Sequence, residues 1–344
     1  MSQPSLRAAV IGLGRHGFRH LQAYQRIEAL ELAAVCDVRA DQVAAVLKEY
    51  QGVKGYTDWK ELLQNERLDL VSVVTNGPSH ASITIAAAEH GVKHVMCEKP
   101  MATSVKDALA MIRMCSDRGT RLAVCHGRRW VKGYKDLRDL IANGLIGKPG
   151  HFSFTCGGGL FAGNGTHIMD LVRFLSGSNA SLVIGFVDKA DKPNPRGADF
   201  KDPGAVALYF FDNGSRFIID MCDDIGVSQR FEIVGDKGRV LFDELEGRWE
   251  VTARPNENGS NPVTPNWWDL MRPVPFEPVV LDMVEMVGNG LQELLSGEEI
   301  TCTGEDGLAA LEMAIGAHVS SRKGSGRIQL PLAEEYRQID IPFT

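Results

Sequence analysis

Two ionisable side chains, Lys99 and His167, have the chemistry and the sequence context needed to move a proton. Lys99 follows Glu98 and a short apolar run, His94–Cys97. A lysine held partly out of water has a lowered pKa and can exchange a proton near neutral pH. His167 follows a glycine-rich stretch at residues 157–165. Imidazole titrates in the range suited to a hydroxyl proton, so both side chains are candidates for acid–base chemistry.

Each candidate also has a structural interpretation. Most lysines in loops between a strand and a helix are solvated, and Lys99 could be one of them. Thr166 is a plausible N-cap, which would place His167 in the first turn of a helix, with Asp170 three residues on along the same face. Taken alone, His167 is therefore better explained as a core or capping histidine.

The run His94–Cys97 is the element that must position Lys99. It is short, apolar and flanked by helical patterns, which is typical of a strand buried in a parallel sheet. Pro100 cannot donate to a strand ladder, so it marks the end of this strand. Glu98 and Lys99 are therefore expected at the carboxyl edge of the sheet, where open α/β sheets bind ligands.

A phosphate-binding signature lies near the beginning of the chain. The apolar run Leu6–Ile11 leads into a Gly-x-Gly-x-x-Gly motif, and a helical pattern follows to about residue 29. The glycines permit a tight turn, close approach of a pyrophosphate and close packing of helix on strand, with the phosphates at the helix N-terminus. The residues expected around the phosphates are Gly12, Gly14, Arg15, His16 and Gly17.

An acidic residue follows the next predicted strand, residues 32–36. Asp37 lies twenty residues beyond Gly17, where a carboxylate would accept hydrogen bonds from an adenosine ribose. Because Asp37 would repel a 2′-phosphate, the sequence favours NAD over NADP. Arg39 could hold that phosphate, so NADP stays possible. Asp37 could alternatively cap the next helix, although Asp41 could fill that role.

Strands and helices continue to alternate through residue 126. Helical patterns cover residues 41–50, Trp59–Asn65 and 104–118, and apolar strands cover residues 70–74 and 122–125. This alternation predicts a doubly wound parallel sheet, a Rossmann domain, in residues 1–126. Loops after two of its strands should meet at the ligand edge. Besides Lys99, these loops add four residues to the expected cofactor site: Thr75, Asn76, His80 and Glu98. His80 also has a structural interpretation, because a histidine near the start of a helix is more often structural.

The pattern changes in residues 127–344. Residues 151–155 alternate like a strand, and residues 179–189 are a further candidate. Residues 206–211 and 216–221 flank Asp212-Asn213-Gly214, and residues 231–234 and 239–242 flank a second turn. Short turns between strands are typical of antiparallel hairpins. We therefore predict a second, α+β domain with a mostly antiparallel sheet.

Composition excludes several classes of protein. The 344 residues carry a net charge of −7 and are 44% hydrophobic and 24% charged. Without basic blocks or a long apolar run, neither nucleic acid nor a membrane is expected as a partner. A strand near residue 6 leaves no room for a signal peptide, and the seven cysteines lack Cys-x-x-Cys spacing. These features predict a cytoplasmic protein with reduced cysteines, and we expect no metal site.

Taken in order, these motifs resemble the Gfo/Idh/MocA family of oxidoreductases. The most specific match is Gly-Val-Lys-His-Val-Met-Cys-Glu-Lys-Pro at residues 91–100, and the resemblance covers nearly the whole chain. It implies a Rossmann domain followed by a domain with a large, mostly antiparallel sheet used for substrate binding and subunit pairing. It also implies a cis Lys99–Pro100 bond and a homodimer or homotetramer.

The resemblance reverses the interpretation of His167, which aligns with the histidine that assists proton removal in the family's dehydrogenases. It places Lys99 near the nicotinamide and the substrate. The residues expected to bind substrate are Lys99, Arg129, Trp130, Asn164 and His167. One position departs from the pattern: many dehydrogenases of the family carry Asp four residues before the histidine, and this chain has Gly163. Without that carboxylate, the pKa of His167 is expected near that of an unperturbed imidazole, unless Asp170 or a water supplies the missing hydrogen bond.

The expected function is an NAD(P)-dependent dehydrogenase acting on a secondary alcohol of a sugar, cyclitol or related polyol. An NAD-dependent glycosidase of the same family is one alternative, and a cofactor-binding regulator without catalysis is another. The segments 277–296 and 304–321 should pack on the sheet. The Pro- and Asn-rich stretch 254–278, with Trp267 and Trp268, suits either a sugar or a neighbouring subunit.

Overall fold

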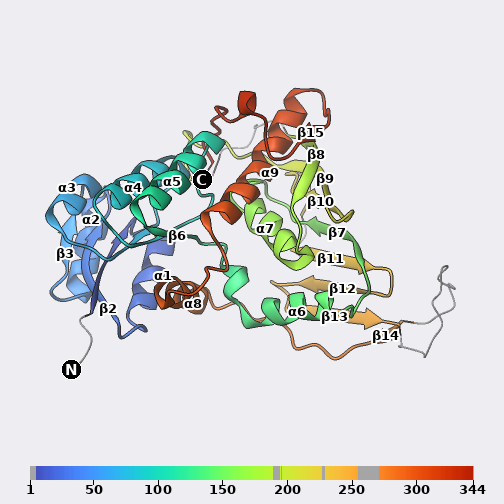
Figure 1. Ribbon diagram of the computed structural model, residues 1–344, viewed down its shortest axis with the longest axis horizontal. Coiled ribbons are helices and arrows are strands. Elements are labelled where there is room, and N and C mark those ends of the chain that lie inside the picture. The colour runs from blue at the N-terminus through green and yellow to red at the C-terminus, as the bar shows by residue number, and fades with distance from the viewer. Residues whose placement is uncertain (1–4, 189–193, 195, 227–228, 255–270, 344) are drawn as a thin grey trace.

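The computed structural model describes residues 5–188, 194, 196–226, 229–254 and 271–343. Two lobes lie side by side, each built around one sheet (Figure 1). The long helix α9 (Gly304–Arg322) contacts α5 (Val105–Arg118) and β6 (Arg121–Val124) in the first lobe and β8 (Ala180–Val187) in the second. It therefore connects the sheet that carries Lys99 to the sheet of the second lobe.

The first lobe confirms the predicted Rossmann fold. Its six parallel strands have the order β3-β2-β1-β4-β5-β6, in which the order reverses between β1 and β4. Ligands bind at the carboxyl ends of the strands at such a switch point. The remaining strands of this sheet are β1 (Leu6–Ile11), β2 (Leu30–Cys36), β3 (Lys54–Tyr56), β4 (Leu70–Val73) and β5 (His94–Cys97).

Local chemistry explains where the first-lobe helices begin and end. Ser104 caps α5 by accepting a hydrogen bond from the Asp107 amide at 3.1 Å, and Gly119 ends this helix at φ 65. Both are preferred cap residues, one for its oxygen and the other for its freedom at positive φ. The other helices here are α1 (Arg15–Tyr24), α2 (Ala40–Glu49), α3 (Trp59–Asn65) and α4 (Gly77–Glu89).

The second lobe is a nine-stranded sheet with the order β14-β13-β12-β11-β7-β10-β9-β8-β15. Its neighbours are antiparallel except β7 and β10, which run parallel. Both predicted hairpins are present, between β9 and β10 and between β11 and β12. The strands besides β8 are β7 (Pro149–Thr155), β9 (Ala205–Phe211), β10 (Arg216–Asp220), β11 (Arg230–Gly235), β12 (Gly238–Asp243), β13 (Arg248–Ala253), β14 (Arg272–Pro273) and β15 (Ile328–Gln329).

The two closing helices have different neighbours. Helix α9 packs on β8 and on α7 (Gly165–Ser176), as expected for a helix on the second sheet. Helix α8 (Met283–Ser296) instead packs on α1 and on the 3₁₀ turn η1 (Gly127–Trp130), at the first lobe. The expectation that residues 277–296 pack on the second sheet is therefore wrong for the helical part. Between the lobes, η1 is followed by α6 (Lys132–Ala142).

Three strands escaped prediction, namely β3, β13 and the two-residue β15, and part of one loop is a strand. Lys54–Tyr56 is three residues long and largely exposed, while Arg248–Ala253 pairs with β12 across a turn that ends at Gly247, φ 66. Within the stretch 254–278, Arg272–Pro273 pairs with β13. Trp267 and Trp268 lie outside the described residues. Among the described helices, none has the length and apolar composition to cross a bilayer.

Candidate active site

The three glycines after β1 have the geometry that a dinucleotide requires. A Cβ on Gly12, which has φ 102, would lie 2.4 Å from the Val74 carbonyl oxygen, and a Cβ on Gly17 would lie 2.1 Å from the Gly12 carbonyl oxygen. A Cβ on Gly14 would meet nothing within 4 Å. Gly12 and Gly17 therefore serve the turn and the packing of α1, and Gly14 leaves open space for a ligand.

The N-terminus of α1 offers unpaired N–H groups to a pyrophosphate. The helix begins at Arg15, its N-cap Gly14 makes no side-chain cap, and its first turn holds no acidic residue. Free amides and the helix dipole both favour an anion at this position. The arrangement fits the phosphates of NAD. Arg15 is exposed and His16 half-buried beside it.

Asp37, at the end of β2, is held in place by the glycine turn. Its Oδ2 accepts a hydrogen bond from the Leu13 amide at 2.8 Å, and its Oδ1 accepts from the Arg39 amide at 2.9 Å and from Arg39 Nε at 3.3 Å. The Arg39 side chain is 55% exposed. A carboxylate and a guanidinium therefore lie together where the adenosine ribose is expected.

We predict that Asp37→Ser weakens NAD binding on the order of tenfold and improves NADP binding, because the carboxylate that repels a 2′-phosphate is gone while Arg39 remains. Titration of the unliganded protein with each cofactor measures both constants. Asp41→Ser, in the first turn of α2, is the matched control and should leave both unchanged. An unaltered ratio of NADP to NAD affinity in Asp37→Ser would remove Asp37 from cofactor selection.

Lys99 lies at the carboxyl edge of β5, as the sequence predicts, and it is 8% exposed. Its Nζ donates a hydrogen bond to the Gly163 carbonyl oxygen at 2.7 Å. Burial lowers the pKa of Lys99, against the opposing charges of Glu98 and Asp202. The Lys99–Pro100 bond is cis. A buried ammonium with a lowered pKa is suited to accept and return a hydroxyl proton.

Glu98 directly follows β5 and precedes Lys99, and it is 7% exposed. Its Oε1 lies 3.3 Å from His20 Nε2, and His20 Nδ1 lies 3.0 Å from Ser72 Oγ. Burial opposes the charge of Glu98, but the His20 hydrogen bond and the nearby His16 and Lys99 outweigh it and hold the pKa of Glu98 below its usual range.

One cluster of described residues has the chemistry of a metal site. Potential ligand atoms of His20, Glu98 and Cys125 lie within 4.8 Å of one another. Burial and the adjacent Glu98 carboxylate hold the pKa of the Cys125 thiol well above its ordinary value. His20 and Cys125 each interact with Glu98, so the cluster forms a polar network centred on that carboxylate.

The loop after β4 and the start of α4 carry one buried and one exposed candidate for cofactor binding, His80 and Asn76. His80 is 1% exposed, and its ring nitrogens lie 2.8 Å from the Pro100 carbonyl oxygen and 2.9 Å from that of Thr75. It therefore fastens this loop to the Lys99–Pro100 segment. Asn76 is exposed at the N-cap of α4 and makes no side-chain cap there, so its amide is open to a ligand.

His167 is the third residue of α7, in the first turn as expected, but Thr166 is not its cap. The N-cap is Asn164, which is exposed and makes no side-chain cap, while the Thr166 hydroxyl donates to the Ala162 carbonyl oxygen at 2.7 Å. His126, which sequence analysis missed, lies edge-on to His167 with ring centroids 5.6 Å apart. His126 is 2% exposed, and burial lowers its pKa to about 4.

The surroundings of His167 keep its imidazole neutral. Burial, and then the positive charges of Lys99 and Arg128 and the rings of His126 and His16, hold the pKa of His167 well below its ordinary value. The expectation of an unperturbed imidazole is therefore wrong, because burial disfavours the charged ring and the positive charges of Lys99 and Arg128 add to that effect. Its Nδ1 is buried without a hydrogen-bond partner among the described residues.

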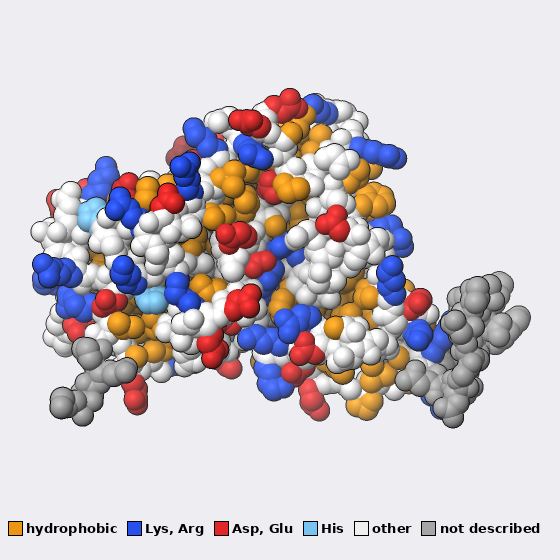
Figure 2. Space-filling model, in the orientation of Figure 1, with side chains coloured by type: hydrophobic (Ala, Val, Ile, Leu, Met, Phe, Trp, Pro, Cys, Tyr) orange, Lys and Arg blue, Asp and Glu red, His pale blue; other side chains and the backbone are white. Residues whose placement is uncertain are grey.

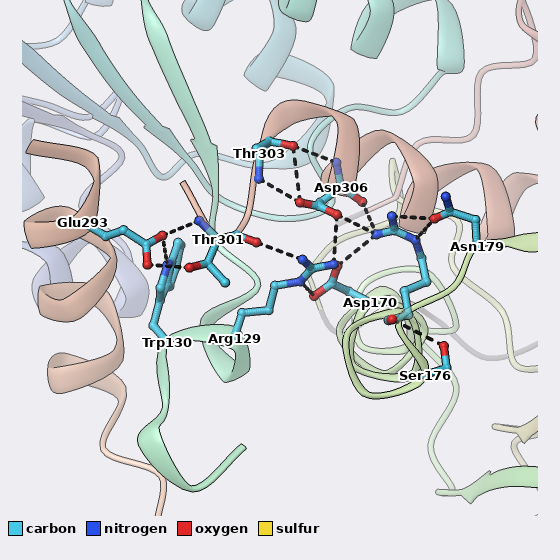
Figure 3. A network of polar contacts seen from close by, with 10 residues as sticks. Arg129, Trp130, Asp170, Ser176, Asn179, Glu293, Thr301, Thr303 and Asp306 are labelled. Carbon is cyan, nitrogen blue, oxygen red and sulfur yellow. Dashed lines mark hydrogen bonds and ion pairs between the residues drawn. The ribbon is translucent and has the colours of Figure 1, made fainter. Parts of the chain in front are cut away.

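Asp170 does not supply the missing partner of His167, because it binds Arg129. Arg129 donates from Nε to Asp170 Oδ2 and from Nη2 to Asp170 Oδ1, both at 2.8 Å (Figure 3). The same guanidinium reaches Asp306 Oδ1 at 3.0 Å and the Thr301 carbonyl oxygen at 2.8 Å. This network ties α7 to α9 and the segment before it, and it fixes the helix that carries His167.

Arg129 and Trp130 were expected to contact substrate, and in the structure both side chains are buried in contacts with other residues. The Arg129 side chain is 8% exposed and pairs with the carboxylates of Asp170 and Asp306. Trp130 is 2% exposed and donates from Nε1 to Glu293 Oε1 at 2.9 Å (Figure 3). Both side chains hold the junction between the lobes. Figure 2 shows basic and acidic side chains gathered over the middle of this face, where the lobes meet.

Together these residues form a site with two parts, one for the dinucleotide and one for the substrate hydroxyl. The glycine turn, Asp37 and the α1 N-terminus form a dinucleotide cradle. In the second part, Lys99 provides an amine of lowered pKa, and the start of α7 provides the neutral His167 and its exposed N-cap Asn164. This arrangement can bind a hydroxyl group, remove its proton and return it.

Comparison with known proteins identifies both halves of the chain. Residues 6–126 match the model of an oxidoreductase family described as an NAD-binding Rossmann fold, and residues 155–330 match that family's C-terminal alpha/beta domain. The myo-inositol 2-dehydrogenase of Thermotoga maritima is 29% identical over 334 residues, which cover 92% of this chain and 96% of the relative. The D-apiose dehydrogenase of Paraburkholderia graminis is 27% identical over 343 residues, covering 92% and 88%. The crystal structure of a probable dehydrogenase from Thermotoga maritima superposes with a TM-score of 0.74 at 27% identity, covering 94% of this chain and 99% of that one.

Proposed function

The chain belongs to the Gfo/Idh/MocA family of NAD-binding oxidoreductases, and on that premise we propose that it oxidises a secondary alcohol of a sugar, cyclitol or related polyol. The observation that carries this proposal is Lys99, a buried amine of lowered pKa at the ligand edge of a Rossmann sheet. Bound NAD would accept the hydride from the carbinol carbon. The chain must then remove the hydroxyl proton, which is the task assigned to Lys99.

Lys99 and His167 divide the work on the substrate hydroxyl. The neutral amine of Lys99 takes the proton as the carbonyl forms and returns it in the reverse direction. His167, held neutral by burial and by the positive charges of Lys99 and Arg128, orients the hydroxyl through a hydrogen bond instead of acting as the main base. Asn164 is exposed beside it and offers both donor and acceptor groups to a neighbouring hydroxyl.

The cofactor is held by the first lobe. The glycine turn and the N-terminus of α1 bind the pyrophosphate, Asp37 accepts from the adenosine ribose, and Asn76 is open to the nicotinamide half. Two relatives with broad coverage are named for a cyclitol and a branched sugar, which supports a polyhydroxylated substrate.

The test is NADH formation by the purified protein with NAD and a panel of cyclitols, aldoses, alditols and their acids. We expect sustained NADH production with at least one member that carries a ring secondary alcohol. Cleavage of an aryl glycoside without net NADH would point to the glycosidase alternative. Binding of NAD without turnover of any panel member would contradict the dehydrogenase assignment.

We also propose that the chain forms a homodimer or homotetramer through the face of the second sheet opposite α7 and α9. The side chains on this open face of β8, β9 and β10 alternate with the buried ones and are mostly apolar: Leu182, Ile184, Phe186, Val206, Leu208, Phe210 and Ile218. Phe186 is 59% exposed and Ile218 is 39% exposed. A contiguous apolar surface of this kind is typical of a protein interface.

We predict that Ile218→Lys shifts the mass measured by light scattering from an oligomer toward a monomer, because the lysine charge would have to be buried in the interface. Val280→Lys replaces another exposed apolar residue, 81% exposed and outside the sheet, and should leave the mass unchanged. A wild-type mass equal to one chain at micromolar concentration would contradict the proposed interface.

A further inference from the structure

A carboxylate from a distant segment reaches the turn that precedes His167. Asp202 Oδ1 accepts a hydrogen bond from the Ala162 amide at 2.8 Å, and its Oδ2 accepts from the Gly163 amide at 2.7 Å. Asp202 is 6% exposed. Both oxygens are therefore committed to two successive amides of one turn, and the second of these amides is that of Gly163.

The backbone around Asp202 holds the same turn. The Leu160 amide donates to the Asp202 carbonyl oxygen at 3.0 Å, and the Phe161 amide donates to the Pro203 carbonyl oxygen at 3.4 Å. Leu160 has φ 58, in the left-handed region that is unfavourable for a leucine. The turn therefore relies on contacts with the segment 202–203, since its own conformation is strained at residue 160.

Residue 163 joins Asp202 to Lys99. Its amide donates to Asp202 Oδ2, while its carbonyl oxygen accepts the hydrogen bond from Lys99 Nζ at 2.7 Å. The position of this carbonyl oxygen depends on the turn, and the turn is held by Asp202. A hydrogen bond to the ammonium form favours the charged state of a lysine, as does a carboxylate nearby.

We propose that Asp202 is a positioning residue for Lys99, which holds the Gly163 carbonyl against the lysine amine and places a carboxylate charge near that amine. The catalytic meaning of this role rests on the proposed function, because it concerns the proton chemistry assigned to Lys99. The electrostatic role itself is a property of the protein without substrate.

The charges facing both groups agree with this role. Burial raises the pKa of Asp202 to about 6, although the two amides and the positive charges of Lys99 and Arg196 act against burial. A pKa of about 6 leaves Asp202 mostly ionised at neutral pH. Burial and Arg196 lower the pKa of Lys99, whereas the carboxylates of Glu98 and Asp202 raise it. Removing the Asp202 charge, and with it the support for the Gly163 carbonyl, should therefore lower the pKa of Lys99 further.

The experiment compares wild type with Asp202→Asn in two measurements. The first is the pH titration of the Lys99 signal in protein labelled with ¹³C-lysine, assigned with a Lys99→Arg variant, which needs no substrate. The second is the pH profile of kcat/KM for alcohol oxidation. We expect both midpoints to move to lower pH in Asp202→Asn, on the order of one pH unit, while the affinity for NAD stays unchanged.

Asp282→Asn is the matched control. Asp282 also accepts two backbone hydrogen bonds, from the Val284 and Glu285 amides at 2.8 and 3.0 Å, but it caps α8 and is exposed. This variant should move neither midpoint. A Lys99 titration identical in wild type and folded Asp202→Asn would overturn the proposal. If no panel substrate is oxidised, the proposed function fails, whereas the NMR titration still decides the role of Asp202.

Wild-type protein provides a second test if Asp202→Asn does not fold. The amide signals of Ala162 and Gly163 should titrate together with a midpoint of about 6, because protonation of Asp202 weakens both hydrogen bonds. Amide shifts of Ala162 and Gly163 that stay constant from well below to well above this midpoint would show that the Asp202 charge does not hold the turn, and would overturn the proposal.

Discussion

Lys99→Ala is expected to lower kcat on the order of 100- to 10,000-fold while the dissociation constant for NAD stays nearly unchanged. Lys99 is the buried amine at the end of β5, whereas the phosphate and ribose contacts come from the turn after β1 and from Asp37. Loss of a general acid–base group slows the chemical step without removing the cofactor contacts. Steady-state NADH formation and NAD titration on the same preparation measure the two quantities.

Lys106→Ala is the control for this variant, because Lys106 is exposed in the first turn of α5. It should behave as wild type in both measurements. In wild type, kcat/KM for oxidation should rise with pH as Lys99 loses its proton and then reach a plateau. The midpoint of this rise should lie below the pKa of a free lysine, because burial lowers the pKa of Lys99. Turnover of Lys99→Ala within a few-fold of wild type would show that Lys99 is only a loop residue.

His167→Ala is expected to reduce kcat on the order of 100-fold with little change in the melting temperature. Helix α7 is fastened through Asp170 and Arg129, not through His167, so the fold should tolerate the change. The rival view, in which His167 only stabilises the start of α7, predicts lower stability at unchanged turnover per folded molecule. Thermal unfolding and kcat measured on one preparation separate the two.

The pH dependence gives His167 a further test. Burial and the positive charge of Lys99 hold its pKa well below that of an ordinary imidazole, so wild-type oxidation should show no acid limb in the usual histidine range. His90→Ala, at an exposed position after α4, controls for loss of an imidazole. An acid limb at an ordinary histidine pKa that disappears in His167→Ala would contradict the neutral, orienting role.

The sequence predicted the first lobe well because its signals are local. The glycine motif directly follows β1, and a proline lies just beyond β5, so both strands have the predicted bounds. Asp37 and Lys99 therefore lie at the ligand edge, as expected. Local ambiguity explains the misplaced helix start. The hydroxyl of Thr166 can cap a helix or bond back to residue i−4, and here it binds the Ala162 carbonyl oxygen.

The rest of the site could not be predicted, because its contacts join distant positions. Asp202 lies 39 residues beyond Gly163, and Arg129 lies 177 residues before Asp306. No periodicity relates such pairs, and the partners are chosen by tertiary packing. His126 follows a strand that sequence analysis ended at residue 125, so a search of the residues just after each strand would have found it.

Transfer of deuterium from the carbinol carbon of a substrate to the cofactor tests hydride transfer and its dependence on Lys99 in one experiment. Wild-type protein is incubated with NAD and a C-deuterated substrate from the panel, and the reduced cofactor is analysed by mass spectrometry. Lys99→Ala is examined at the same occupancy of NAD. The proposed mechanism predicts one deuterium in each reduced cofactor formed by wild type and almost no reduced cofactor from Lys99→Ala. Reduced cofactor without deuterium, or equal yields from the two proteins, would contradict it.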